Sequence, residues 1–82
     1  MSTVTVYSLP DCPNCVSTKR FMNRQNVSYM EDNLTVDSAD RLGYRTAPIV
    51  TETVDGVESV LWAGGLNVDG IIGLSRRARV SA

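Results

Sequence analysis

Two cysteines separated by two residues, Cys12 and Cys15, are the only cysteines in the chain and constrain its fold most strongly. They follow an apolar, β-branched run at Val4–Tyr7 and precede a helix-like run that begins at Val16. If a short loop joins this strand to the helix, Cys12 lies at the N-terminus of the helix. Unpaired N–H groups and the helix dipole favour an anion at that position, and here the anion is a nucleophilic thiolate.

Cys15 lies three residues further on and faces the same side of the predicted helix, so the two residues are close enough to form a disulfide. The pair is therefore predicted to cycle between dithiol and disulfide. Pro13 suits the first helical turn, because its missing N–H would have no partner there. Asp11 repels a thiolate, so we expect only a moderate lowering of the thiol pKa. A purely structural disulfide is the weaker interpretation, because so short a loop removes little entropy from the unfolded chain.

The length, charge and histidine content of the chain exclude several classes of function. Eighty-two residues predict one domain, residues 1–82, and a net charge of −1 argues against nucleic-acid or membrane-surface binding. The chain has no histidine, so two cysteines cannot complete a tetrahedral zinc site within it. Neither a signal peptide nor a membrane-spanning run is visible. We therefore expect a reducing cytoplasm, where a C-x-x-C pair is more often catalytic than structural.

Periodicity and turn signals predict seven elements in the order β-α-β-α-β-β-α. Strands are expected at residues 3–8, 27–33, 49–53 and 58–62, and helices at residues 13–25, 38–42 and 68–80. Asn26 is expected to end the first helix in a left-handed conformation. Asp37 is expected to cap the second helix, Gly43 to end it, and Asn67 to cap the third. Asp55-Gly56 is a hairpin signal, which makes the last two strands antiparallel, whereas the first two belong to a right-handed β-α-β unit.

This order, with C-x-x-C after the first strand, resembles the thioredoxin/glutaredoxin fold, an α/β fold with a four-stranded mixed sheet and three flanking helices. Residues 5–15 resemble the strand and active-site loop of glutaredoxins and NrdH-type redoxins. Residues 43–50 resemble the segment that carries the family's cis-proline, with Pro48 in its place. Residues 62–65, Trp-Ala-Gly-Gly, resemble both the W-S-G-F segment of NrdH-redoxins and the G-G segment of glutaredoxins. The chain thus resembles a small glutaredoxin-like redoxin of bacterial or phage type, closer to the NrdH-redoxins.

The resemblance implies thiol–disulfide exchange in which Cys12 attacks a substrate disulfide and Cys15 resolves the mixed disulfide. It also implies that the backbone before Pro48 pairs with the substrate chain like an added strand. The residues expected to bind substrate are Pro10, Asp11, Pro13, Thr46, Ala47, Pro48, Gly64 and Gly65.

The NrdH-type role is that of an electron donor to ribonucleotide reductase, recycled by thioredoxin reductase. The resemblance implies a monomer with no bound cofactor besides the redox-active Cys12–Cys15 pair, working in the cytoplasm, or in the host cytoplasm if a phage encodes it. Leu9 stands where related proteins commonly carry a lysine that helps to hold glutathione.

Three alternatives stay open. The first is a glutathione-dependent glutaredoxin, with glutathione as the reductant. The second is a copper-binding module that holds Cu(I) through both thiolates, as in small metal-chaperone domains of order β-α-β-β-α-β. The third is a dimer bridged by an iron–sulfur cluster, as some glutaredoxins form.

Overall fold

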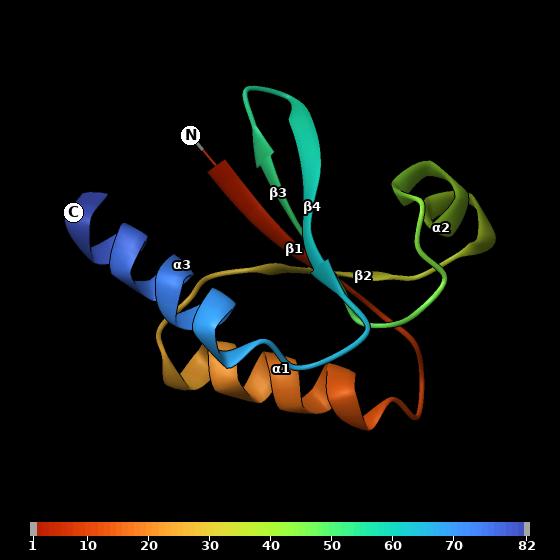
Figure 1. The fold of residues 1–82 in the computed structure, drawn as a ribbon, viewed down its shortest axis with the longest axis horizontal. Helices are drawn as coiled ribbons and strands as arrows, with labels where there is room; N and C mark the ends of the chain where they lie inside the picture. The colour runs from red at the N-terminus through yellow and green to blue at the C-terminus, as the bar shows by residue number, and fades with distance from the viewer. Residues whose placement is uncertain (1, 82) are drawn as a thin grey trace.

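The computed structural model describes residues 2–81, with side chains described through Arg77. Seven elements follow one another in the predicted order (Figure 1). They are β1 (Ser2–Ser8), α1 (Pro13–Arg24), β2 (Met30–Asn33), α2 (Val36–Leu42), β3 (Ile49–Val54), β4 (Val57–Ala63) and α3 (Val68–Ser81). None of the helices between residues 2 and 81 combines the length and apolar character needed to cross a bilayer.

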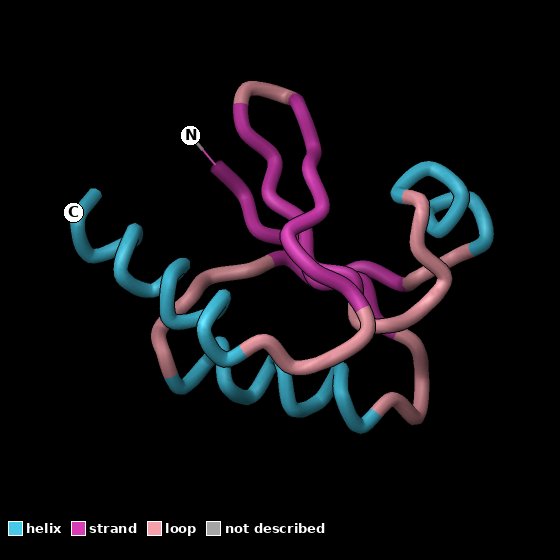
Figure 2. Tube along the Cα trace, in the orientation of Figure 1, coloured by secondary structure: helices cyan, strands magenta, loops and turns pink. Residues whose placement is uncertain are grey.

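The four strands form one mixed sheet in the order β2-β1-β3-β4. β1 pairs in parallel with β2, whereas β3 is antiparallel to both β1 and β4. Helices α1 and α3 lie together on one side of the sheet, and α2 lies apart from them (Figures 1 and 2). This arrangement confirms the predicted α/β fold of thioredoxin type.

The core lies between the sheet and the two helices α1 and α3. Strand residues Val6 and Val50 are fully buried there against Met22 of α1 and Ile71 of α3. Trp62 packs against the same cluster from β4. Because strand side chains alternate between faces, the neighbours of Val6 and Val50 point to the opposite face, toward α2.

A β-bulge in β4 changes this alternation. Val50 pairs with Trp62 but Thr51 pairs with Val60, so Leu61 is an extra residue without a partner on β3. In a regular strand, Glu58 and Trp62 would share one face because they are four residues apart. The bulge instead lets Trp62 enter the core while Glu58 lies on the face toward α2.

Two sequence predictions were wrong in detail. Asp37 does not cap the second helix: Thr35 does, through a capping box in which Ser38 N–H donates to Thr35 Oγ1 and Thr35 N–H donates to Ser38 Oγ. A Ser at the third helical position, in place of the usual Glu or Gln, hid this box in the sequence. The helix therefore starts at Val36.

The second strand begins at Met30 and not at residue 27. Asn26 adopts a left-handed conformation (φ 58°), as predicted for a helix stop, and the Val27 N–H then donates back to the Met22 carbonyl over 2.9 Å. This hydrogen bond caps the end of α1, so the Val27 N–H is not available to pair with β1. The other predicted bounds lie within two residues of those observed.

Candidate functional site

The two cysteines lie at the start of α1, as predicted. Cys12 is the N-cap residue, with extended backbone (φ −110°, ψ 101°), and Pro13 occupies the first turn. The Cys15 N–H donates to Cys12 Sγ over 3.2 Å, and the Val16 N–H donates to the Cys12 carbonyl over 3.1 Å. The Cys12 sulfur thus takes the place of the usual capping oxygen, in the position where N–H groups stabilise negative charge.

Cys12 and Cys15 form a disulfide, with their Cα atoms 5.2 Å apart. Their accessibility differs: Cys15 is only 1% exposed, whereas Cys12 is partly exposed. Cys12 is therefore the more accessible of the two residues, and Cys15 is shielded from solvent beside it. Within the described residues, no group of three or more His, Cys, Asp or Glu side chains is arranged to hold a metal ion.

The loop before Cys12 is exposed and has an unusual backbone. Asp11 has a positive φ of 56°, in the left-handed region that Asp and Asn tolerate better than other non-glycine residues. Leu9, Pro10 and Pro13 are exposed around it. The predicted residues Pro10, Asp11 and Pro13 are thus exposed next to Cys12 in the chain, with a carboxylate directly before the cysteine.

The peptide bond between Ala47 and Pro48 is cis. Pro48 itself is fully buried, whereas Thr46 is exposed and Ala47 is partly exposed. The loop therefore offers the side chain of Thr46 and the backbone beside it to the solvent, while the proline anchors it in the protein.

The Gly64-Gly65 loop lies against the Pro48 loop. The Gly64 N–H donates to the Pro48 carbonyl over 2.8 Å. Gly64 has a φ of +90°, and a Cβ added there would stand 3.1 Å from Thr46 Oγ1. Glycine is needed at residue 64 for both its backbone conformation and its close approach to Thr46.

The strand register brings these loops to one end of the sheet. Ile49 pairs with Tyr7 on one side and with Ala63 on the other. The loop after β1, the loop before β3 and the loop after β4 therefore leave the sheet at neighbouring points, as Figure 2 shows. All the sequence-predicted site residues belong to these three loops or to the first turn of α1.

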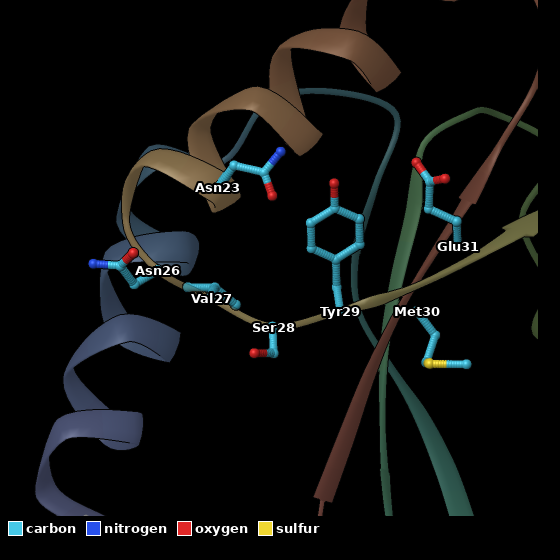
Figure 3. Close-up of a pocket in the computed structure, with 7 residues that line it drawn as sticks. All are labelled: Asn23, Asn26, Val27, Ser28, Tyr29, Met30 and Glu31. Atoms are coloured by element: carbon cyan, nitrogen blue, oxygen red, sulfur yellow. The ribbon is translucent and has the colours of Figure 1, made fainter.

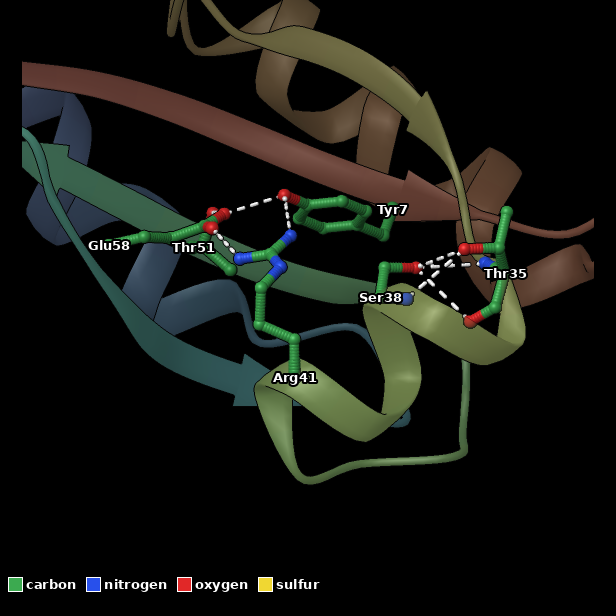
Figure 4. A network of polar contacts seen from close by, with 6 residues as sticks. All are labelled: Tyr7, Thr35, Ser38, Arg41, Thr51 and Glu58. Carbon is green, nitrogen blue, oxygen red and sulfur yellow. Dashed lines mark hydrogen bonds and ion pairs between the residues drawn. The ribbon is translucent and has the colours of Figure 1, made fainter.

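Sequence reasoning missed a polar network on the sheet face toward α2 (Figure 4). Glu58 Oε2 accepts hydrogen bonds from the Tyr7 hydroxyl over 2.6 Å and from Thr51 Oγ1 over 2.7 Å. Arg41 of α2 forms an ion pair with Glu58 Oε1 and donates to the Tyr7 oxygen over 3.2 Å. The only indication of this network in the sequence is Glu58, a charged residue inside a predicted strand.

The network shifts the pKa values of its members. Burial, followed by the neighbouring Glu58 carboxylate, raises the pKa of Tyr7 above its ordinary value of 10.0. Burial by itself would also raise the pKa of Glu58, but the hydrogen bonds from Tyr7, Thr51 and Arg41 outweigh it and lower the pKa below 4.5. At neutral pH the network thus holds a neutral tyrosine between an arginine cation and a carboxylate.

A hollow on the surface lies away from the cysteines. It has a volume of about 760 Å³ and is formed by the last turn of α1 and the chain from Asn26 to Glu31 (Figure 3). The cysteines are at the other end of α1, which spans about 18 Å for its 12 residues. Its lining is mostly polar and includes neither cysteine, so it is not part of the cysteine site.

Two comparisons with known proteins found proteins that are similar to this chain. Residues 4–56 match the sequence model of the family described as Glutaredoxin. The crystal structure of a mutant of the thioredoxin-like protein BC3987 is similar to this chain, with 32% sequence identity and a TM-score of 0.61. The similarity covers 93% of this chain and 97% of that one. No curated protein matches the chain.

Proposed function

Because this chain belongs to the glutaredoxin family and is a thiol–disulfide oxidoreductase, we propose that Cys12 is its nucleophile and Cys15 its resolving cysteine. The observation that carries this proposal is the difference in exposure at the start of α1. Cys15 is 1% exposed beside a partly exposed Cys12 that caps the helix. A thiolate at a helix N-terminus is stabilised by the same N–H groups that would otherwise lack partners.

In the proposed reaction, the Cys12 thiolate attacks one sulfur of a substrate disulfide and expels the other sulfur as a thiolate. The Cys15 thiolate then attacks the Cys12 sulfur of the mixed disulfide. The Cys12–Cys15 disulfide forms and the second substrate thiolate leaves. Two electrons pass from the protein to its substrate, and a separate reductant restores the dithiol.

The three loops at this end of the sheet are proposed to bind the substrate chain. The exposed Thr46 and the backbone of Ala47 offer groups that an extended chain could pair with, and Pro48 fixes their position. Gly64 and Gly65 leave room for the backbone of the partner. Pro10, Asp11 and Pro13 would contact the substrate on the side of Cys12.

We further propose that the physiological substrate is a protein disulfide, that of ribonucleotide reductase, and that thioredoxin reductase restores the dithiol. The Trp62–Gly65 segment, which is similar to that of NrdH-redoxins, supports this choice, as does Leu9 in place of a glutathione-binding lysine. Such a donor would act as a monomer in a reducing cytoplasm.

The glutathione-dependent alternative keeps the same chemistry and changes only the reductant. The copper-binding alternative loses its basis, because metal-chaperone domains have the order β-α-β-β-α-β and this chain does not.

A coupled assay of NADPH oxidation tests the proposal. The oxidised protein is supplied either with thioredoxin reductase or with glutathione and glutathione reductase, each with insulin as the terminal disulfide. Turnover with thioredoxin reductase alone supports the NrdH-type role, and ribonucleotide reductase is then the next substrate. Turnover with glutathione alone would make the protein a glutaredoxin in function. If there is no turnover with either reductant, and the protein also fails to accelerate the reduction of insulin by dithiothreitol, the proposed reaction is contradicted.

A further inference from the structure

Helix α2 buries few of its side chains fully. Of its seven residues, only Ser38 and Ala39 are buried, Leu42 is half-buried, and Val36 is 70% exposed. Small buried side chains contribute little hydrophobic stabilisation, because they remove little apolar area from water. The position of α2 over the sheet must therefore depend substantially on polar contacts.

The strongest polar contact between α2 and the sheet is the network around Glu58. Its carboxylate receives hydrogen bonds from β1 (Tyr7) and β3 (Thr51), and pairs with Arg41 in the last turn of α2. Arg41 also donates to the Tyr7 oxygen, which closes a ring of contacts among three strands and one helix (Figure 4). The Glu58 side chain is only 18% exposed, whereas that of Arg41 is 54% exposed. Solvent therefore screens the hydrogen bonds from Tyr7 and Thr51 to the carboxylate less than the ion pair with Arg41.

Arg41, the residue that α2 contributes to this network, lies three positions before the loop of residues 44–47 in the chain. Two residues after Arg41, Gly43 ends α2 in a left-handed conformation, and the chain then runs through Tyr44, Arg45 and Thr46 to the buried Pro48. All three of these loop side chains are exposed. The Arg45–Asp40 ion pair within this region is exposed at both ends, and such pairs stabilise little. One end of the loop is therefore fixed by β3 and the other by the end of α2.

We propose that Tyr7, Arg41 and Glu58 are positioning residues that hold the loop of residues 44–47 in place for an extended disulfide substrate. This inference rests on the proposed function, because the loop matters only if the substrate chain contacts it. Loosening α2 should impair reactions with a peptide chain that pairs with Thr46 and Ala47. It should leave the intrinsic reactivity of the Cys12 thiolate unchanged, since the network contacts neither cysteine.

The test compares two disulfides of different size. Ellman's reagent is a small aromatic disulfide that reports thiolate reactivity, whereas insulin presents a disulfide within a peptide chain. Pre-reduced protein is mixed with each in the absence of other thiols, and the second-order rate constants are measured for wild type, Glu58→Gln and Tyr7→Phe. We expect the insulin rate constant to fall about fivefold in both variants, with the rate constant for Ellman's reagent changed less than about twofold.

Glu52→Gln is the matched control. Glu52 is also a strand glutamate, its side chain is 13% exposed, and it pairs with an arginine of a helix, Arg77 of α3. That pair lies on the other face of the sheet, away from α2, so its loss should leave the ratio of the two rate constants unchanged. Tyr7→Phe removes a single oxygen and keeps the test valid if Glu58→Gln folds poorly.

The outcomes distinguish the positioning role from the proposed function. An unchanged ratio in Tyr7→Phe and Glu58→Gln, an equal fall with both disulfides, or the same change in Glu52→Gln would overturn the positioning role and leave the proposed function intact. Failure of wild type to reduce insulin, with normal reactivity toward Ellman's reagent, would overturn the proposed protein substrate as well. Hydrogen exchange gives an independent readout, because amides of residues 36–47 should exchange faster in Glu58→Gln than in Glu52→Gln.

Discussion

Gly70 in α3 lies directly against the indole ring of Trp62 in β4: a Cβ added to Gly70 would stand 2.8 Å from Trp62 Cζ3. The same Cβ would stand 2.9 Å from Asn67 Nδ2, and Asn67 caps α3 through its Oδ1, which accepts from the Gly70 N–H over 2.9 Å. The start of α3 can therefore approach β4 only because residue 70 has no side chain. Trp62 is in turn the last core residue before the Gly64-Gly65 loop.

Gly70→Ala should destabilise the protein. Overpacking a tight contact costs about 1–3 kcal/mol, and the better helix propensity of alanine returns up to about 1 kcal/mol. We expect a net loss of about 1 kcal/mol in urea unfolding, with a shift in the fluorescence of Trp62, the only tryptophan. Gly73→Ala is the control, since nothing lies within 4 Å of its added Cβ, and it should stabilise α3. Equal effects of the two substitutions would contradict the close contact.

Gly64→Ala should affect both stability and the site. Alanine at φ +90° is strained by about 1–2 kcal/mol, and its Cβ would also press on Thr46. Gly56→Ala carries similar strain (φ +82°) with nothing within 4 Å, in the β3–β4 turn at the other end of the sheet. Both variants should lose stability, but only Gly64→Ala should slow insulin reduction. If Gly56→Ala slows it equally, the effect comes from stability and not from the loop.

Substitution of each cysteine tests their roles separately. Cys12→Ser should abolish disulfide reduction, because it removes the exposed nucleophile. Cys15→Ser should retain the first attack and accumulate a mixed disulfide with the substrate, visible by mass spectrometry and lost on adding dithiothreitol. Full activity of Cys12→Ser, or a trapped complex on Cys15, would reverse the assignment.

Asp11→Asn should make Cys12 more reactive. The substitution removes a negative charge next to the thiolate and keeps a side chain that tolerates the left-handed backbone at φ 56°. We expect alkylation of the reduced protein by iodoacetamide near pH 6 to accelerate about twofold, the size expected of one exposed charge nearby. Asp55→Asn is matched in backbone (φ 52°) but lies in the β3–β4 turn, and should change nothing. An equal rate for Asp11→Asn and wild type would contradict this electrostatic role.

The lowered pKa of Glu58 predicts a dependence of stability on pH. Because the folded state binds the Glu58 proton less tightly than the unfolded state does, its contribution is complete above the ordinary value of 4.5. This contribution is lost as the pH falls through the folded pKa. At neutral pH, Glu58→Gln should be less stable than wild type by about 1–2 kcal/mol, as expected for lost hydrogen bonds to a charged group. The difference should shrink between about pH 5 and pH 3 in urea unfolding, and a constant difference would exclude the carboxylate as its source.

The sequence by itself determined the elements and the redox centre. A β-branched run, a C-x-x-C pair with proline in the first turn and a periodic helix are adjacent along the chain, so local rules were enough to place Cys12 at the start of α1. The element order, the left-handed Asn26 and the caps at Gly43 and Asn67 followed from equally local signals. These features depend on residues only a few positions apart.

Tertiary structure alone decided which residues meet across the sheet. The register of β3 with β1 and β4 brings the Pro48 loop beside Gly64, and no local pattern encodes a register. The unpaired Leu61 moves Glu58 to the face opposite Trp62, where it meets Tyr7, 51 residues earlier in the chain. The physical reason is that a bulge and an ion pair between distant segments depend on how those segments pack together, whereas sequence periodicity records only the preference of each segment for one face.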